Sequence, residues 1–299
     1  MEHAELISKA FGDVKKSLFG FSTFPTWIKL FLLILVPVII GGIAATIILQ
    51  LIVKPILVAF FVNDNYGFTE AGLTHTLQFF AILFAFLCLF IVPLFQGFMY
   101  RLIRSDAFPK IGNGFGLFFS GWRVNIVCLF YAIPMLIIYA LFGLLYYFAA
   151  GKVSAISTFV IGGNSIGNIV VFIIYLALQF ITFIAVSLFA IISLVHVARG
   201  ASYKDAFRFR NTAKIIKEIG WYNYILCVVI CAIFVLILTV IFLGIAMGFT
   251  GNLLANVIVV FIYLFLLIPI ATFCCRYLTL VHDVGTAPKE EDVEDFDNF

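Results

Sequence analysis

The residues that could bind a metal ion or act as nucleophiles are few and lie far apart in the sequence. Cys227 and Cys231 are four residues apart, so on a helix they would share one face, where two thiolates could bind a soft metal ion. His196 and His282, in the segments LVHVAR and LVHDVG, could form a metal-binding pair only if those segments meet. No further Cys, Asp or Glu has a spacing that completes either site. We therefore predict that the cysteines are small packing residues and that the histidines lie at helix ends.

Other catalytic patterns are also missing from the sequence. The glycine-rich segments GNGFG (112–116) and GGNSIG (162–167) could offer backbone N–H groups to an anion, but neither lies between a strand and a helix, so we interpret both as turns. No serine lies in a nucleophile-elbow pattern. None of the 15 acidic residues lies centrally in an apolar segment, which weighs against ion-coupled transport. The sequence predicts a protein that is not an enzyme and has no catalytic residue, metal or cofactor.

The strongest chemical signal is electrostatic and lies between Arg199 and Trp221, a segment between two apolar runs. Small and apolar residues recur in it at steps of three and four, the spacing of one helix face: Ala206, Phe209, Ala213, Ile216 and Gly220. We predict one helix over Arg199–Gly220 that lies on the membrane, with Phe209, Ala213 and Ile216 towards the acyl chains. The candidate contacts with anionic lipid head groups are Arg199, Lys204, Arg208, Arg210, Lys214 and Lys217. The alternative is a helix that packs on neighbouring spans and is basic because it is cytoplasmic.

Composition determines which elements position these residues. The chain is 64% hydrophobic and 11% charged, with a mean hydropathy of +1.19, which predicts an all-α polytopic membrane protein. We predict six transmembrane helices, at about 28–53, 74–104, 122–149, 168–198, 221–248 and 253–282. The first 26 residues carry no secretory signal pattern and are predicted to form a surface-lying helix. Its predicted apolar face consists of Ile7, Phe11, Val14, Leu18 and Phe21.

The distribution of positive charge predicts the orientation. With these six spans, all but two of the 18 basic residues fall on one side, the exceptions being Lys54 and Lys152. Basic residues stay on the cytoplasmic side, so we predict a cell-membrane protein with both termini in the cytoplasm. Residues 1–284 then form a single membrane domain, and 285–299, which are rich in acids, form a disordered cytoplasmic tail. Membrane lipids are the expected partners, and no nucleic acid is expected.

The three tryptophans indicate an internal repeat. Trp27, Trp122 and Trp221 are nearly evenly spaced, and Cys128 and Cys227 each follow their tryptophan by six residues. We predict three tandem two-helix units, at about 1–105, 106–200 and 201–284, each preceded by a cytoplasmic interfacial helix and anchored by its tryptophan. A GxxxG pattern at Gly244 and Gly248 offers a packing face for another membrane protein.

A family resemblance rests on the segment from Gly97 to Pro134. The matching positions are Gly97-Phe98, Arg101, Pro109, Phe118-Phe119-Ser120-Gly121 and Tyr131-Ala132-Ile133-Pro134. With these residues the chain resembles a family of uncharacterised multi-pass membrane proteins common in archaea, domain of unknown function four-zero-one-three. The segment ASYKDAFRFRNTAKIIKEIGWYNYI is similar to the family's second cytoplasmic segment, so the resemblance covers roughly 90–285. The acidic, tryptophan-containing turn often found after the proline is absent here. The resemblance implies a membrane protein and no activity.

Three hypotheses for function follow. The first is a non-enzymatic membrane protein whose basic surface helices bind anionic lipid or partner proteins. The second is a transporter or facilitator of a lipid or hydrophobic small molecule that is not ion-coupled, which convergence of Gln96, Asn125 and Gln179 on one cavity would favour. The third, a membrane enzyme, has the least support because no acid–base constellation is present.

Overall fold

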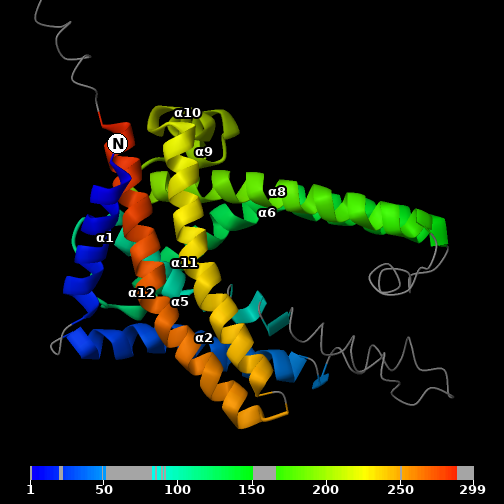
Figure 1. Ribbon diagram of the computed structural model, residues 1–299, viewed down its shortest axis with the longest axis horizontal. Coiled ribbons are helices and arrows are strands. Elements are labelled where there is room, and N and C mark those ends of the chain that lie inside the picture. Colours follow the sequence, from blue (N-terminus) through cyan, green and yellow to red (C-terminus); the bar gives the residue numbers. More distant parts are fainter. Residues whose placement is uncertain are drawn as a thin grey trace, which may run out of the picture. The chain divides into compact units, whose positions relative to one another are not determined.

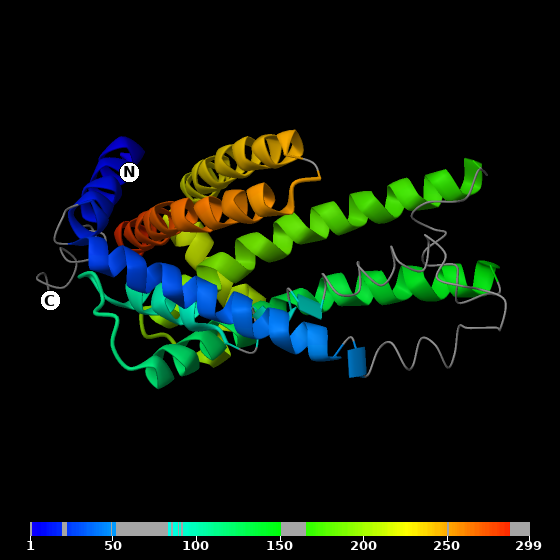
Figure 2. The same cartoon turned by 90° about the horizontal axis from the view of Figure 1, so that it is seen from below.

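The computed structural model describes residues 2–19, 23–48, 50–51, 83–84, 86–88, 90, 92–150, 166–249 and 251–287. Within these ranges the chain is helical and contains no strand, which confirms the predicted all-α class (Figure 1, Figure 2). Among the described residues, five helices are long and apolar enough to cross a membrane, as expected of a multi-pass membrane protein. They are α2 (Phe24–Ile48), α6 (Gly114–Ala150), α8 (Ile166–Ala198), α11 (Trp221–Gly248) and α12 (Leu253–Thr286).

The second of the six predicted spans, 74–104, lies partly outside the described residues. Its described end is not a continuous helix, because Val92 and Pro93 are non-helical and α5 (Leu94–Arg104) begins after them. Pro93 has no backbone N–H to donate, and its ring disfavours a helical conformation for the preceding residue. The helix of this predicted span is therefore interrupted at Val92 and Pro93.

The chain divides into two compact units. The first consists of Met1–Asn125 and Leu226–Val284, and the second of Ile126–Ile225 and Gly285–Phe299. In the first unit α11 and α12 run side by side, and the rings of Phe234 and Phe273 lie 5.2 Å apart between them (Figure 1, Figure 2).

Helix α1 (His3–Leu18) lies within the first unit, and one of its faces is buried in the protein. Every fourth residue is buried: Leu6, Ala10, Val14 and Leu18. Of the predicted apolar face, Val14 and Leu18 are buried, Phe11 is 59% exposed, and Phe21 lies outside the described residues. The imidazole Nδ1 of His3 lies 2.7 Å from the hydroxyl of Tyr277, which joins α1 to α12.

Helices α5 and α6 cross in close contact within the first unit. A Cβ atom on Gly97 would clash with the carbonyl of Leu117, and one on Gly121 would clash with the carbonyl of Pro93. Glycine at both positions therefore lets the two backbones touch. Arg276 of α12 is buried and donates from Nη1 to the carbonyl oxygen of Ser105, 2.6 Å away, at the C-terminal end of α5. This basic residue, counted in the charge asymmetry, thus has a structural role.

In the second unit the predicted helix over Arg199–Gly220 is two helices. They are α9 (Tyr203–Ala206) and α10 (Phe209–Ile219), and the extended backbone of Arg208 separates them. The positive φ angles of Gly200 (113°) and Gly220 (92°) turn the chain at the two ends of the segment. Helix α9 starts at Ser202, whose hydroxyl accepts a hydrogen bond from the backbone N–H of Lys204. The prediction of a single continuous helix is therefore wrong, although the segment is helical over most of its length.

Candidate membrane-surface site

Five basic side chains between Lys204 and Lys217 are exposed, and we call them together the basic face. Its members are Lys204, Arg208, Arg210, Lys214 and Lys217, all exposed. Within α10, Arg210, Lys214 and Lys217 follow one another at steps of four and three, so they lie along one side of the helix. Arg199, the sixth predicted contact, is not a member of the basic face. It directly follows α8, is half-buried, and interacts with other residues of the protein.

Two acidic residues reduce the charge of the basic face. The carboxylate of Glu218 lies 3.8 Å from Nζ of Lys214, one helical turn away, and both side chains are solvent-exposed. An exposed pair of this kind contributes little stability and leaves the lysine able to contact other anions. Asp205 accepts a hydrogen bond from Nδ2 of Asn211 at 3.1 Å. The segment therefore keeps an excess of positive charge.

The opposite side of α10 packs on the protein. Its buried residues are Thr212, Ile215, Ile216 and Ile219. Helix α10 contacts α8 and α9, as the position of these three helices in Figure 1 shows. Ile216 is fully buried, so the prediction that it faces acyl chains is wrong, and Phe209 is 46% exposed. For the apolar side of the segment, the structure thus favours the alternative of packing on neighbouring helices.

A buried network of hydroxyl groups ties α9 and α10 to the longer helices. The hydroxyl of Tyr131 on α6 donates to the carbonyl oxygen of Ala206 at 2.7 Å and lies 2.7 Å from Oγ of Ser193 on α8. Oγ1 of Thr212 on α10 lies 2.9 Å from the Ser193 hydroxyl and 3.3 Å from that of Tyr131. Because each buried polar atom finds its partner on another helix, the network fixes where the basic segment sits in this unit.

Aromatic rings at the junction of α9 and α10 add a second attachment. The ring of Phe207 lies 4.6 Å from that of Phe130, and the ring of Phe209 lies 5.3 Å from Tyr131 and 5.8 Å from Phe189. Such tilted and edge-to-face pairs are each worth about 0.5–1.5 kcal/mol beyond the area they bury. The break at Arg208 thus places two phenylalanines against the protein while the basic side chains point away.

The three predicted tryptophan anchors occupy three different environments. Trp27 is only 7% exposed and packs against Phe265, with ring centroids 4.5 Å apart. Trp122 lies inside α6, two turns after its first residue, and its ring is 6.4 Å from that of Phe118. Trp221 starts α11 and is 43% exposed. Trp221 is thus the most exposed of the three.

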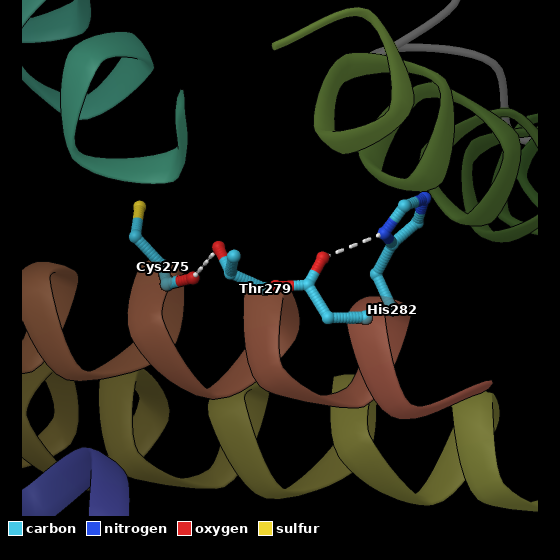
Figure 3. Close-up of polar contacts among 4 residues, drawn as sticks. Cys275, Thr279 and His282 are labelled. Atoms are coloured by element: carbon cyan, nitrogen blue, oxygen red, sulfur yellow. Dashed lines mark hydrogen bonds and ion pairs between the residues drawn. The ribbon is translucent and has the colours of Figure 1, made fainter. Parts of the chain in front are cut away.

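The cysteines and histidines form no metal centre within the part of the chain that is described, where no group of three or more His, Cys, Asp or Glu residues could hold a metal ion. Cys227 and Cys231 are buried. Sγ of Cys274 lies 3.9 Å from the carbonyl oxygen of Cys231. On the last turns of α12, Thr279 donates to the carbonyl oxygen of Cys275 at 2.7 Å, and Nδ1 of His282 lies 3.2 Å from a carboxylate oxygen of Asp283 (Figure 3).

Sequence reasoning missed the residues of the hydroxyl network. Ser193 is a lone polar residue in an apolar run, a pattern that many membrane helices share, and Thr212 is one of several polar residues in the basic segment. In the sequence, Tyr131 stands out only as the first residue of the Tyr-x-x-Pro motif that ends at Pro134. A tyrosine buried in a span needs a hydrogen-bond partner for its hydroxyl. The presence of Tyr131 within a predicted span is therefore the one feature of the sequence that could have indicated the network.

The comparison with known proteins agrees with the motif that contains Tyr131. The family described as "Protein of unknown function (DUF4013)" matches residues 79–247, more than half of the chain. The chain belongs to this family. The match confirms the resemblance inferred from the motifs, and it covers both the α5–α6 crossing and the basic face. No curated protein and no solved structure matches the chain.

The DUF4013 motif positions in this chain have structural roles. Gly97 and Gly121 form the close crossing of α5 and α6, and Tyr131 holds α9 and α10 through its hydroxyl. The side chain of Arg101 reaches the space beside Gly116, where a Cβ atom would meet its guanidinium group. These four residues build the scaffold, whereas the exposed basic residues form the surface that a ligand could contact.

Proposed function

We propose that this DUF4013 protein is a non-enzymatic membrane protein whose basic face binds the head groups of anionic lipids at the cytoplasmic surface. The observation that carries the proposal is that five basic side chains are exposed between Lys204 and Lys217, while the buried side of the same segment is held by the hydroxyl network of Tyr131, Ser193 and Thr212. A fastened helix presents its charges without a further entropic cost of ordering the backbone. Each basic residue near an anionic membrane surface contributes about 1 kcal/mol.

The proposed lipid binding predicts the outcome of one charge substitution. In the variant R208Q/R210Q/K214Q/K217Q, we expect the amount of phosphatidylglycerol retained by detergent-purified protein to fall by roughly tenfold or more at low salt, because ~1 kcal/mol per residue is lost over four residues. Retention by the unsubstituted protein should itself decrease with added salt, which screens exposed charges. The measurement is the molar ratio of lipid to protein by mass spectrometry, with circular dichroism to verify the helical content.

The matched control removes four exposed lysines from another part of the chain. The variant K9Q/K15Q/K16Q/K29Q changes the net charge by the same amount at exposed positions on α1 and α2. We expect it to retain more anionic lipid than the α9–α10 variant. Equal losses in both variants would mean that lipid responds to net charge alone, and unchanged retention in the α9–α10 variant would refute the proposal.

The proposed topology places both chain termini in the cytoplasm and position 163 outside, and it rests on the asymmetry of basic residues. Gly163 lies outside the described residues. In a background without native cysteines, a membrane-impermeant maleimide added to intact cells should label Gly163→Cys but neither Ser8→Cys nor Glu290→Cys. Permeabilised cells should label all three. Labelling of Ser8→Cys in intact cells would show that the orientation is wrong.

We also keep two proposals about architecture. The first is that six spans form three tandem two-helix units; the near-even tryptophan spacing supports it, although Gly121 lies inside a helix whereas Gly220 forms a turn. The second is that Gly244 and Gly248 contact another membrane protein. It is supported by the exposure of both glycines on α11, where an added Cβ would meet no atom within 4 Å.

A further inference from the structure

The segment that follows α12 carries the opposite charge to the basic face. Residues 288–299 contain six acids and one lysine: Glu290, Glu291, Asp292, Glu294, Asp295 and Asp297 against Lys289. The basic face has five exposed positive side chains within residues 204–217. The two segments therefore have nearly equal and opposite charge, although about 70 residues separate them in the sequence.

The structure places the end of α12, which precedes the acidic segment in the sequence, beside the end of α10. Gly285, in the last turn of α12, lies against Ile219, the last residue of α10, so closely that a Cβ atom on the glycine would lie 2.8 Å from the Cα atom of Ile219. Both residues belong to the second compact unit. The last turn of α12 thus lies at the C-terminal end of the helix that carries Arg210, Lys214 and Lys217.

The acidic segment is long enough to reach every residue of the basic face. Twelve extended residues span about 40 Å, whereas the 11 residues of α10 span about 16 Å. Because the connection is short, the effective concentration of the acidic segment at the basic face is in the millimolar range. Intramolecular binding at such a concentration needs only weak electrostatic attraction.

We propose that residues 289–297 dock on the basic face and compete with anionic lipid for it. This inference rests on the proposed lipid binding and adds its regulation: the chain itself supplies the competing anion. A segment that occupied the basic face for three-quarters of the time would weaken the apparent lipid affinity about fourfold. Salt weakens both interactions, whereas a high density of anionic lipid displaces the segment.

The direct test uses the full chain with Phe296→p-benzoylphenylalanine, a photo-cross-linking residue within the acidic segment. In zwitterionic nanodiscs, we expect illumination to give a cross-link within residues 203–219. It should decrease several-fold in the R208Q/R210Q/K214Q/K217Q variant and on replacement of the nanodisc lipid by phosphatidylglycerol. The K9Q/K15Q/K16Q/K29Q variant should leave it unchanged. Cross-links confined to other segments, or a cross-link insensitive to the α9–α10 variant, would overturn docking.

The competition is tested by neutralising the acidic segment. In E290Q/E291Q/D292N/E294Q/D295N/D297N, we expect retained phosphatidylglycerol to rise about fourfold at low salt, as release of the basic face requires. The control E2Q/E5Q, at exposed positions at the start of α1, should not change retention. A cross-link to α10 with no rise in retention would overturn the competition. If instead the α9–α10 variant retains as much lipid as the unsubstituted protein, the proposed lipid binding fails while docking stands.

Discussion

Gly121→Ala is expected to lower the stability of the protein by roughly 3 kcal/mol, even though it adds a single methyl group. The added Cβ would overlap the carbonyl oxygen of Pro93 and lie 2.8 Å from the Cβ atom of the same proline. A backbone carbonyl cannot rotate away as a side chain does, so α5 and α6 must separate. The loss should appear as a fall of roughly 6–12 °C in the midpoint of thermal unfolding in detergent.

The matched control adds the same methyl group to a glycine in open space. Gly244 lies in the interior of α11, and a Cβ atom added there would meet nothing within 4 Å. Alanine favours a helix interior by about 1 kcal/mol over glycine, so Gly244→Ala should leave the midpoint unchanged or raise it. Equal falls for Gly121→Ala and Gly244→Ala would show that the α5–α6 contact is not the cause.

The two glycines illustrate what sequence could predict about the fold. The all-α class follows from an average over the whole chain, because long apolar runs leave few other structures possible in a membrane. Gly121 and Gly244 look alike in the sequence, since both lie in apolar segments next to bulky residues. Their difference depends on which backbone crosses them, and that is set by residues far away in the chain. Helix packing was therefore beyond the reach of local patterns.

For the candidate site, the sequence predicted the exposed side of the basic segment but not its buried side. The basic residues of the segment are exposed as expected, because a charged side chain at a helix surface avoids a desolvation cost wherever the helix lies. The predicted orientation of the apolar residues was wrong. The pattern Phe209, Ala213 and Ile216 does not include Thr212, which is buried on the side of α10 that packs on the protein. A threonine becomes a good buried residue only when partners satisfy its hydroxyl, and Ser193 and Tyr131 do so from two other helices. The spacing of residues within one segment cannot predict hydrogen-bond partners that lie on other helices.

Tyr131→Phe should loosen the basic segment while leaving the long helices intact. Without the hydroxyl, the buried carbonyl of Ala206 keeps only a contact of 3.4 Å with Oγ of Ser193. Leaving a buried acceptor poorly satisfied costs about 1–3 kcal/mol. If α9 and α10 open locally, that cost increases the open population by roughly tenfold to 100-fold. Trypsin cleavage after Lys204 and Arg208 should accelerate accordingly in detergent-solubilised protein.

Two comparisons separate the loss of this network from a general effect of removing a hydroxyl. Tyr139 lies on the same helix and is 53% exposed, so Tyr139→Phe should leave the cleavage rate unchanged. Thr212→Val should accelerate cleavage on its own, yet add less than its full effect to Tyr131→Phe, because the two hydroxyls belong to one network. Additive effects of these two substitutions would mean that the two hydroxyls act independently and not as one network. Equal rates for Tyr131→Phe and Tyr139→Phe would mean that the aromatic contacts of Phe207 and Phe209 hold the basic face in place without the hydroxyl of Tyr131.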